Sequence, residues 1–247
     1  LQSTDNISIL VNNSGPFIGT SISYQSGYDG SGIVVSIIDT GIDLNHPDLD
    51  GQIIGGYDFV DNDEIPEDTN GHGTQVAGII ASNGNLKGMA PNSKILMYKV
   101  SEDGESVPSH LIIKAIEKSI EDGADIINIS LGINQTNTKI DQMVNKAVKN
   151  NIFVVTAAGN FGPELSTIGS PGINPNAITV GATFNNVTSS LVSTFEIEDK
   201  TFNVFPMVGT QALTEPITSQ IIFGKYGRAN DLLEGNFQDS IMLIERG

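Results

Sequence analysis

One aspartate and one histidine occupy positions from which they could perform acid–base chemistry together. Asp39 ends a continuous apolar run over residues 32–39, and His72 lies between two glycines where a helix-period segment begins. Burying a carboxylate at the end of such a run is costly unless a donor satisfies it. The functional interpretation is that Asp39 accepts a hydrogen bond from the imidazole of His72 and thereby fixes the tautomer of the ring. The alternatives are a solvated Asp-Thr-Gly turn and a structural histidine.

An asparagine and a short polar segment follow two further apolar runs. Asn160 comes after the sequence VVTAAG, and its carboxamide N–H could donate to a developing oxyanion, although Gly-Asn is also a common turn sequence. Ser130, Leu131 and Gly132 come at the end of the DIINIS run. Working residues of parallel α/β sheets gather outside the carboxyl ends of the strands. We therefore expect these groups to lie near the aspartate and the histidine.

Short apolar runs alternate with segments of helical periodicity through most of the chain. The runs cover residues 32–39, 94–100, 125–130, 152–158 and 177–182, and the helix-period segments cover residues 72–82, 109–123 and 138–151. Continuous apolar runs bounded by glycine are typical of strands buried on both faces. The sequence therefore predicts an α/β fold with a mostly parallel sheet between helices. In the first helix, Val76, Ile79 and Ile80 are expected to form the apolar face.

The composition and charge exclude several classes of function. Lys and Arg number 12 against 29 Asp and Glu, a formal net charge of −17, so no basic surface is expected for nucleic acid or an anionic membrane. No apolar run approaches the roughly 20 residues that a membrane-spanning helix needs. A nucleotide-binding domain is a weak alternative, because Gly30 and Gly32 precede a strand instead of following one. The acidic residues from Asp58 to Asp68 could attract a cation, but such runs are usually solvated loops, and no metal ligand is assigned.

Four segments, in this order, carry a resemblance to a known family. They read VVSIIDTGIDLNHPDL, NGHGTQVAGIIA, INISLG and VVTAAGN. They resemble the aspartate, histidine, substrate-binding and oxyanion-hole motifs of the subtilisin-like serine peptidases, or subtilases. The resemblance covers residues 20 to 182, and it implies a subtilisin-like three-layer α/β fold.

The resemblance implies a role for each of the chemically interesting residues. Asp39 would orient and electrostatically support the imidazole, and His72 would be the general base and then the general acid toward the leaving amine. The side chain of Asn160 would donate to the oxyanion.

The resemblance also implies two groups of substrate-binding residues. The backbone of Ser130, Leu131 and Gly132 would pair with an extended polypeptide substrate. The wall of the pocket for the residue before the scissile bond would be formed by Ala157, Ala158 and Gly159.

The serine motif of the family is the one part without a counterpart. No Gly-Thr-Ser-Met-Ala-x-Pro stretch follows Asn160, and the Gly-Thr-Ser at residues 19–21 precedes the aspartate and lacks the rest of the pattern. The tail, residues 185–247, contains short strand-like runs and loosely resembles the first half of a protease-associated (PA) domain. The expectation is a partial catalytic domain over residues 1–184, followed by an incomplete β-rich insertion over residues 185–247.

This interpretation sets further expectations. The partners are a polypeptide substrate and the remainder of the same chain, which would carry the serine, so the fragment alone would be inactive. The location is extracellular or the cell envelope. No cofactor is expected; calcium is possible, but loop 83–87 is shorter than the calcium-binding loop of many relatives and no site is assigned. The alternative function is that of a non-catalytic, peptide-binding subtilase homologue.

Overall fold

The computed structural model describes most of the chain in two compact units. The described residues are 14–104, 107–162, 165–182, 193–197, 200–204, 218–223 and 240–243. Residues up to 182 belong to the first unit, and those from 193 onward belong to the second. The predicted domain boundary at residues 184 and 185 lies outside the described residues and stays a prediction.

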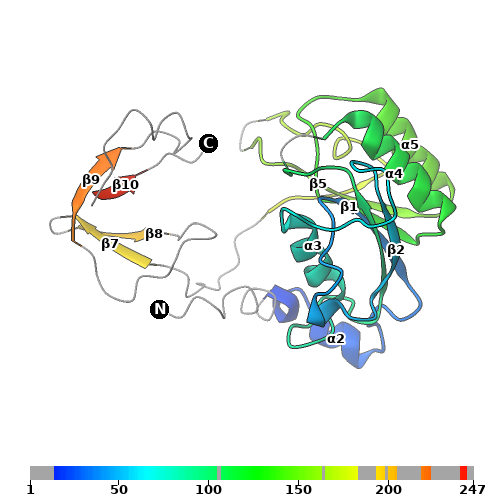
Figure 1. The fold of residues 1–247 in the computed structure, drawn as a ribbon, viewed down its shortest axis with the longest axis horizontal. Coiled ribbons are helices and arrows are strands. Elements are labelled where there is room, and N and C mark those ends of the chain that lie inside the picture. Colours follow the sequence, from blue (N-terminus) through cyan, green and yellow to red (C-terminus); the bar gives the residue numbers. More distant parts are fainter. Residues whose placement is uncertain are drawn as a thin grey trace. The chain divides into compact units, whose positions relative to one another are not determined.

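The first unit is built on a six-stranded sheet with the strand order β2-β3-β1-β4-β5-β6, in which every pair is parallel (Figure 1). Its strands are β1 (Val34–Asp39), β2 (Ile53–Asp58), β3 (Lys94–Lys99), β4 (Ile126–Ile129), β5 (Phe153–Ala157) and β6 (Ile178–Val180). Because all of them are parallel, their carboxyl ends lie along one edge of the sheet. Asp39 is the last residue of β1, so it lies on that edge.

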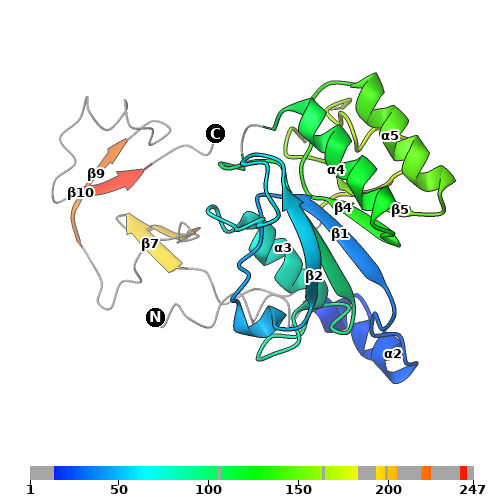
Figure 2. The same cartoon turned by 45° about the vertical axis from the view of Figure 1, so that its right-hand side comes forward.

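Helices cover both faces of this sheet, as the sequence predicts (Figures 1 and 2). Helices α4 (Ser109–Glu121) and α5 (Thr138–Lys149) pack on one face, and α3 (His72–Ala81) packs on the other. Ile37 and Ile38 of β1 are both fully buried. Since successive strand residues point to opposite faces, this burial requires cover on both sides.

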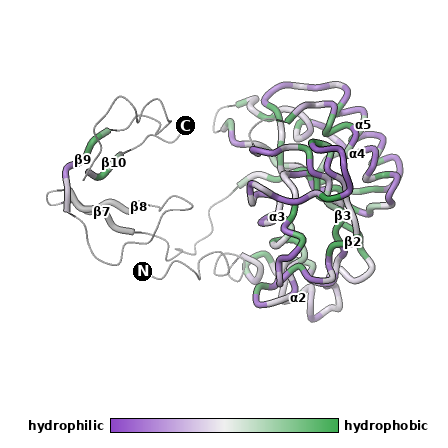
Figure 3. The backbone as a smooth tube through the Cα atoms, in the orientation of Figure 1, coloured by the Kyte–Doolittle hydropathy of each residue, from purple (hydrophilic) through white to green (hydrophobic). Residues whose placement is uncertain are grey.

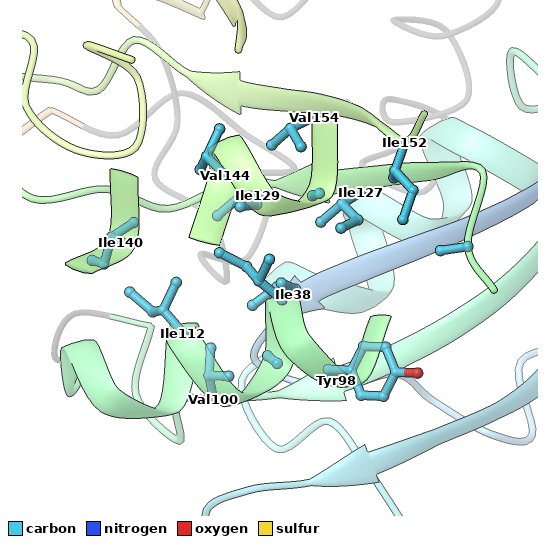
Figure 4. Packing of buried hydrophobic residues seen from close by; sticks show 14 of the residues in the cluster. Ile38, Tyr98, Val100, Ile112, Ile127, Ile129, Ile140, Val144, Ile152 and Val154 are labelled. Carbon is cyan, nitrogen blue, oxygen red and sulfur yellow. The ribbon is translucent and has the colours of Figure 1, made fainter. Parts of the chain in front are cut away.

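The helix-period segments at residues 109–123 and 138–151 form α4 and α5, as predicted, and each helix buries an apolar stripe. Ile112 of α4 and Ile140 and Val144 of α5 are fully buried in one cluster with residues of the sheet (Figure 4). Ile116 of α4 belongs to the same buried cluster. Burying side chains of this size contributes roughly 1.5–3 kcal/mol each. This layer therefore supplies much of the stability of the first unit. Figure 3 shows the matching pattern, with hydrophilic residues along the outer parts of α5.

The predicted face of α3 is only partly right. Val76 and Ile80 are partly buried and pack against the core, but Ile79 is 45% exposed, and the fully buried residues are Gly73, Ala77 and Ala81. This face of small residues lets the backbone of α3 approach the sheet closely. Amphipathic periodicity finds the large residues first, so it misses a helix that packs through glycine and alanine.

Strand β2 is absent from the sequence prediction. It contains Gly55 and Gly56, and the pair interrupts the apolar run that would have marked a strand. A Cβ atom on Gly56 would lie 2.0 Å from the carbonyl oxygen of Met97 in β3. Glycine is therefore required where these two backbones meet.

The remaining elements are short. In the first unit they are α2 (Thr20–Gln25) and the 3-10 helix η1 (Pro47–Leu49). In the second unit, β7 (Ser193–Ile197) pairs with β8 (Lys200–Val204) in antiparallel fashion, and β9 (Gln220–Phe223) pairs with β10 (Ser240–Leu243) in parallel. The strand-like runs of the tail are thus strands. Across the residues that the structure describes, none of the helices combines the length and apolar character that crossing a membrane requires.

Candidate active site

Asp39 and His72 form a hydrogen-bonded pair at the carboxyl edge of the sheet. Asp39 is 2% exposed, and its Oδ1 lies 2.6 Å from Nδ1 of His72. The same oxygen accepts the N–H of Thr40 at 2.8 Å. Because an ionised carboxylate only accepts, the proton of this contact belongs to Nδ1. Within the described part of the chain Nε2 of His72 makes no hydrogen bond, and its side chain is half exposed, so the ring offers a lone pair outward.

The glycines on either side of His72 serve different purposes. Gly71 is the N-cap of α3 and has a φ of 101°, a left-handed conformation that favours glycine. A Cβ atom on Gly73 would lie 2.1 Å from the carbonyl oxygen of Gly41 and 3.2 Å from Cβ of Asp39. The first glycine therefore turns the chain into the helix. The second lets that helix approach the aspartate closely enough for the hydrogen bond.

Electrostatics favour the protonated imidazole. The hydrogen bond to Asp39 raises the pKa of His72, burial of the ring opposes this, and the charges of Asp39 and Asp68 add to the increase, so the pKa lies above 6.5. Among the described residues no donor reaches the buried Oδ2 of Asp39. An unneutralised carboxylate next to the ring can stabilise the imidazolium that forms when Nε2 takes a proton.

The other predicted residues lie at the same edge of the sheet. Strand β4 separates β1 from β5, and neighbouring strands lie about 4.8 Å apart. Ser130, Leu131 and Gly132 follow β4, while Ala157 ends β5. In the described structure, the backbone N–H and C=O groups of Leu131 and Gly132 make no hydrogen bonds. This stretch can therefore pair with an added extended chain.

Residues 157–160 form the end of β5 and the turn that follows it, and they become more exposed along the chain. Ala157 and Ala158 are half buried, and Gly159, with a φ of 87°, turns the chain toward Asn160. Asn160 is exposed, and with respect to the described residues its carboxamide makes no hydrogen bond. A free carboxamide at this edge can donate to a bound molecule.

Ser170 anchors the segment after Gly132, a contact that sequence patterns did not reveal. Its carbonyl accepts the N–H of Ile133 at 3.0 Å, and its N–H donates to the carbonyl of Gln135 at 3.0 Å. Its hydroxyl accepts the N–H of Asn137 and donates to Asp141, both at 2.8 Å. Ser170 is fully buried, so these bonds hold the exit of the 130–132 segment in one position.

A buried lysine and aspartate lie beside the pair, and here the sequence interpretation is wrong. Asp58, expected in a solvated acidic loop, is 1% exposed, and Nζ of Lys99 lies 3.5 Å from its Oδ2. The ammonium also lies 2.8 Å from Glu102 and donates to the carbonyl of Glu67 at 3.0 Å. Burial alone would lower the pKa of Lys99, but the bond to Glu102 and the charges of Asp58 and Glu102 hold it above its ordinary value.

The two other histidines of the chain are accounted for without catalysis. His46 caps η1, and its Nδ1 accepts the N–H of Asp48 at 3.2 Å. His110 lies in the first turn of α4 and is exposed. Neither position calls for a catalytic role.

Loop 83–87 lies against Asp48. The carboxylate of Asp48 accepts the N–H groups of Asn85 at 2.9 Å and of Leu86 at 3.1 Å. No calcium ligand is assigned in this loop. In the described part of the chain, no group of three or more His, Asp or Glu side chains is placed to hold a metal ion.

Comparison with known proteins gives one consistent family. The Subtilase family model matches residues 30–216. The chain is 42% identical to Minor extracellular protease Vpr of Bacillus subtilis (strain 168) over 73% of this chain and 24% of that protein. It is 45% identical to the Major intracellular serine protease of the same organism over 56% of this chain and 46% of that protein. The chain thus spans less than half the length of either relative.

A solved structure supports the fold. The crystal structure of a cold adapted subtilisin-like serine proteinase matches with a TM-score of 0.59 and 34% sequence identity, over 64% of this chain and 57% of that one. The predicted fold class is therefore confirmed: a parallel sheet between helices in the subtilisin-like arrangement.

Proposed function

The chain belongs to the subtilase family, and from this premise we propose that it is part of a serine endopeptidase in which Asp39 and His72 form the acid–base pair. The observation that carries the proposal is the 2.6 Å hydrogen bond from Nδ1 of His72 to the buried carboxylate, with Nε2 left open. This is the arrangement in which an imidazole can accept a proton from a nucleophile.

The proposed reaction uses the pair as its acid–base catalyst. A serine hydroxyl gives its proton to Nε2 of His72 as its oxygen bonds to the scissile carbonyl carbon, and the carbonyl electrons move to the oxygen. Asp39 stabilises the imidazolium, and the free carboxamide of Asn160 donates to the oxyanion. The intermediate then expels the amine, which takes the proton from Nε2. Water repeats the sequence on the acyl-enzyme and releases the second product.

The substrate is an extended polypeptide. The unpaired backbone of Ser130, Leu131 and Gly132 adds the substrate as a neighbouring strand. The small residues Ala157, Ala158 and Gly159 leave room for the side chain that precedes the scissile bond. Nothing charged lies among them, which favours uncharged side chains at that position.

We place the nucleophile in the remainder of the same protein. No stretch after Asn160 has the family's serine motif, and the chain covers only 24% and 46% of the two relatives. Residues 185–247 would then belong to a PA-like insertion between the asparagine and serine motifs. Export from the cytoplasm goes with this proposal, supported by the extracellular relative, although the other relative is named as intracellular.

The experiment is active-site labelling with a peptidyl phosphonate, followed by mapping of the modified peptide by mass spectrometry. In the whole protein we expect one labelled serine, outside residues 1–247, and no label when His72 is replaced by alanine. The 247-residue chain alone should neither label nor hydrolyse peptides. Labelling of a serine within residues 1–247 would overturn the placement of the nucleophile. A whole protein that binds peptides but never labels would be a non-catalytic homologue instead.

A further inference from the structure

Asp68, in the loop before α3, gathers an unusual number of donors. Its Oδ1 accepts from the hydroxyl of Thr40 at 3.0 Å and from the N–H groups of Asn70 at 3.0 Å and Gly71 at 2.8 Å. Its Oδ2 accepts both the N–H and the hydroxyl of Thr74, at 2.9 and 2.6 Å. One partly buried carboxylate therefore binds the residues before and after His72, together with the residue that follows Asp39.

Thr40 completes a closed ring of hydrogen bonds around the pair. Its hydroxyl donates to Asp68 and accepts the N–H of Gly73 at 2.9 Å, and its own N–H donates to Asp39. Because the hydroxyl has one proton, a permanent acceptor at Asp68 leaves its lone pairs for Gly73. The end of β1 and the start of α3 are thus fastened together through this one carboxylate.

We propose that Asp68 is a positioning residue for catalysis: it holds His72 in hydrogen-bonding register with Asp39 by fastening the first turn of α3 to the loop that follows β1. The proposal deepens the proposed peptidase function and rests on it, because the geometry that Asp68 maintains is that of the acid–base pair. Sequence reasoning assigned this aspartate to a solvated acidic loop.

The position requires a carboxylate in particular. All five groups around Asp68 are donors toward it. An asparagine has one acceptor oxygen and one NH₂ group. In one orientation its NH₂ would face the two donors of Thr74, and in the other it would face the three donors of Thr40, Asn70 and Gly71. Asp68→Asn keeps the size and shape of the side chain but breaks the ring of bonds.

The charge of Asp68 also acts on the imidazole. Burial raises the pKa of Asp68, but the bonds from Gly71, Thr74 and Asn70 outweigh it and hold the pKa below its ordinary value, so the group is ionised at neutral pH. The charged groups that raise the pKa of His72 are Asp39 at the end of β1 and Asp68 in this loop. Lys99 of β3 and Glu102 after it bind the same loop through Glu67 and Thr69.

The first test follows His72 itself and needs no peptidase activity. The chain contains three histidines, so ¹⁵N-histidine labelling and NMR titration can follow each ring, with His72→Ala for assignment. We expect Asp68→Asn to lower the pKa of His72 and to speed solvent exchange of its Nδ1 proton. The matched control is Asp61→Asn, which removes the same charge from an exposed position of the same loop and should change neither. An unchanged pKa and exchange rate in a folded Asp68→Asn protein would overturn the proposal.

The second test separates positioning from stability. In the whole protein, Asp68→Asn should lower kcat on the order of 10- to 100-fold with little change in KM, because a small misplacement of a catalytic group has effects of this size. Thr40→Val, which deletes the bridging hydroxyl, should lower kcat in the same way, and Thr40→Ser should retain most of the activity. Equal kcat for the valine and serine variants would contradict a role for the Thr40 hydroxyl in connecting Asp68 to Gly73. If the native whole protein has no activity while the NMR changes occur, the peptidase assignment fails and the positioning role of Asp68 stands.

Discussion

The layer formed by α4 and α5 and the carboxyl edge of β1, β2 and β3 are both buried, but different forces hold them together. The layer is mainly apolar, and residues such as Ile112, Ile140 and Val144 are held by apolar contacts (Figure 4). The edge buries Asp39, Asp58 and Lys99 at 1–2% exposure. Each of these charges depends on particular partners.

The difference shows how the fold divides stability from chemistry. An apolar layer tolerates exchanges that keep its volume, because its attraction is not directional. A buried charge tolerates little, since loss of its partner leaves it unsatisfied in a medium that does not solvate it. Small changes of side chain at the carboxyl edge should therefore alter stability or activity, whereas changes of similar size in the α4 and α5 layer should have little effect.

The largest expected effect separates the two regions by activity. In the whole protein, His72→Ala should reduce kcat on the order of 10⁶-fold, the loss known for the same residue type in the related subtilisin, because no other group takes the proton. The same change should also lower the unfolding free energy, because it leaves the carboxylate of Asp39 buried without its side-chain partner. His110→Ala, in an exposed position on α4, should keep full kcat. Steady-state kinetics on a peptide substrate checks both, and a comparable loss in His110→Ala would break the comparison.

The next effect concerns the buried charges. Lys99→Met should lower the free energy of unfolding by about 3–5 kcal/mol, because it leaves Asp58 buried without its cation. Adding Asp58→Asn to this variant should restore part of the loss. Lys94→Met, at the opposite end of the same strand, removes only an exposed bond to Gly51 and should cost under about 1 kcal/mol. Urea denaturation measures the unfolding free energy of all three variants. An equal loss for Lys99→Met and Lys94→Met would contradict the claim that charges at the carboxyl edge depend on particular partners.

A third change tests the apolar layer. Ile116→Ala should cost about 3 kcal/mol of unfolding free energy, because it removes buried surface and leaves a cavity. Ile79→Ala, on the exposed side of α3, should cost under about 1 kcal/mol. Neither change should move the pKa of His72, measured by NMR titration. A shifted pKa in Ile116→Ala would mean that the two regions are not separable.

The smallest effect is a dependence of stability on pH. The pKa of His72 is raised in the folded state by its bond to Asp39, so folding favours the protonated ring. The contribution is therefore fully present below the unfolded pKa of about 6.5 and is lost as the pH rises through the folded pKa. The difference in unfolding free energy between the native chain and His72→Gln should shrink between pH 5.5 and pH 8.5. A difference that grows with pH would reverse the sign of the interaction.

Much of the fold was predictable because the main strands and two helices carry strong patterns. Strands β1, β3, β4 and β5 are mostly apolar runs, and α4 and α5 bury the stripes that their periodicity indicates. Strand β2 and the fully buried residues of α3 were not predictable in this way, because β2 contains two glycines and α3 buries glycine and alanine. These residues are chosen for close backbone approach, a requirement that hydrophobic periodicity does not record.

The candidate site was predictable in part. The order of the motifs indicated that Asp39 and His72 would meet, and the structure places them within one hydrogen bond. The contacts of Asp68, Lys99 and Ser170 could not be predicted from the sequence. Each residue type is common at its position, and its hydrogen-bond partners come from distant segments of the chain. Side-chain networks between distant segments leave no local signature.

The tautomer of His72 tests the central claim most directly, because the proposed chemistry needs a proton on Nδ1 and a lone pair on Nε2. The ¹⁵N chemical shifts of the neutral ring distinguish the two nitrogens, above the pKa of the imidazole. We expect the proton on Nδ1, with a downfield ¹H resonance that Asp39→Asn removes. A neutral ring that carries its proton on Nε2, with Nδ1 bare beside Asp39, would contradict the account.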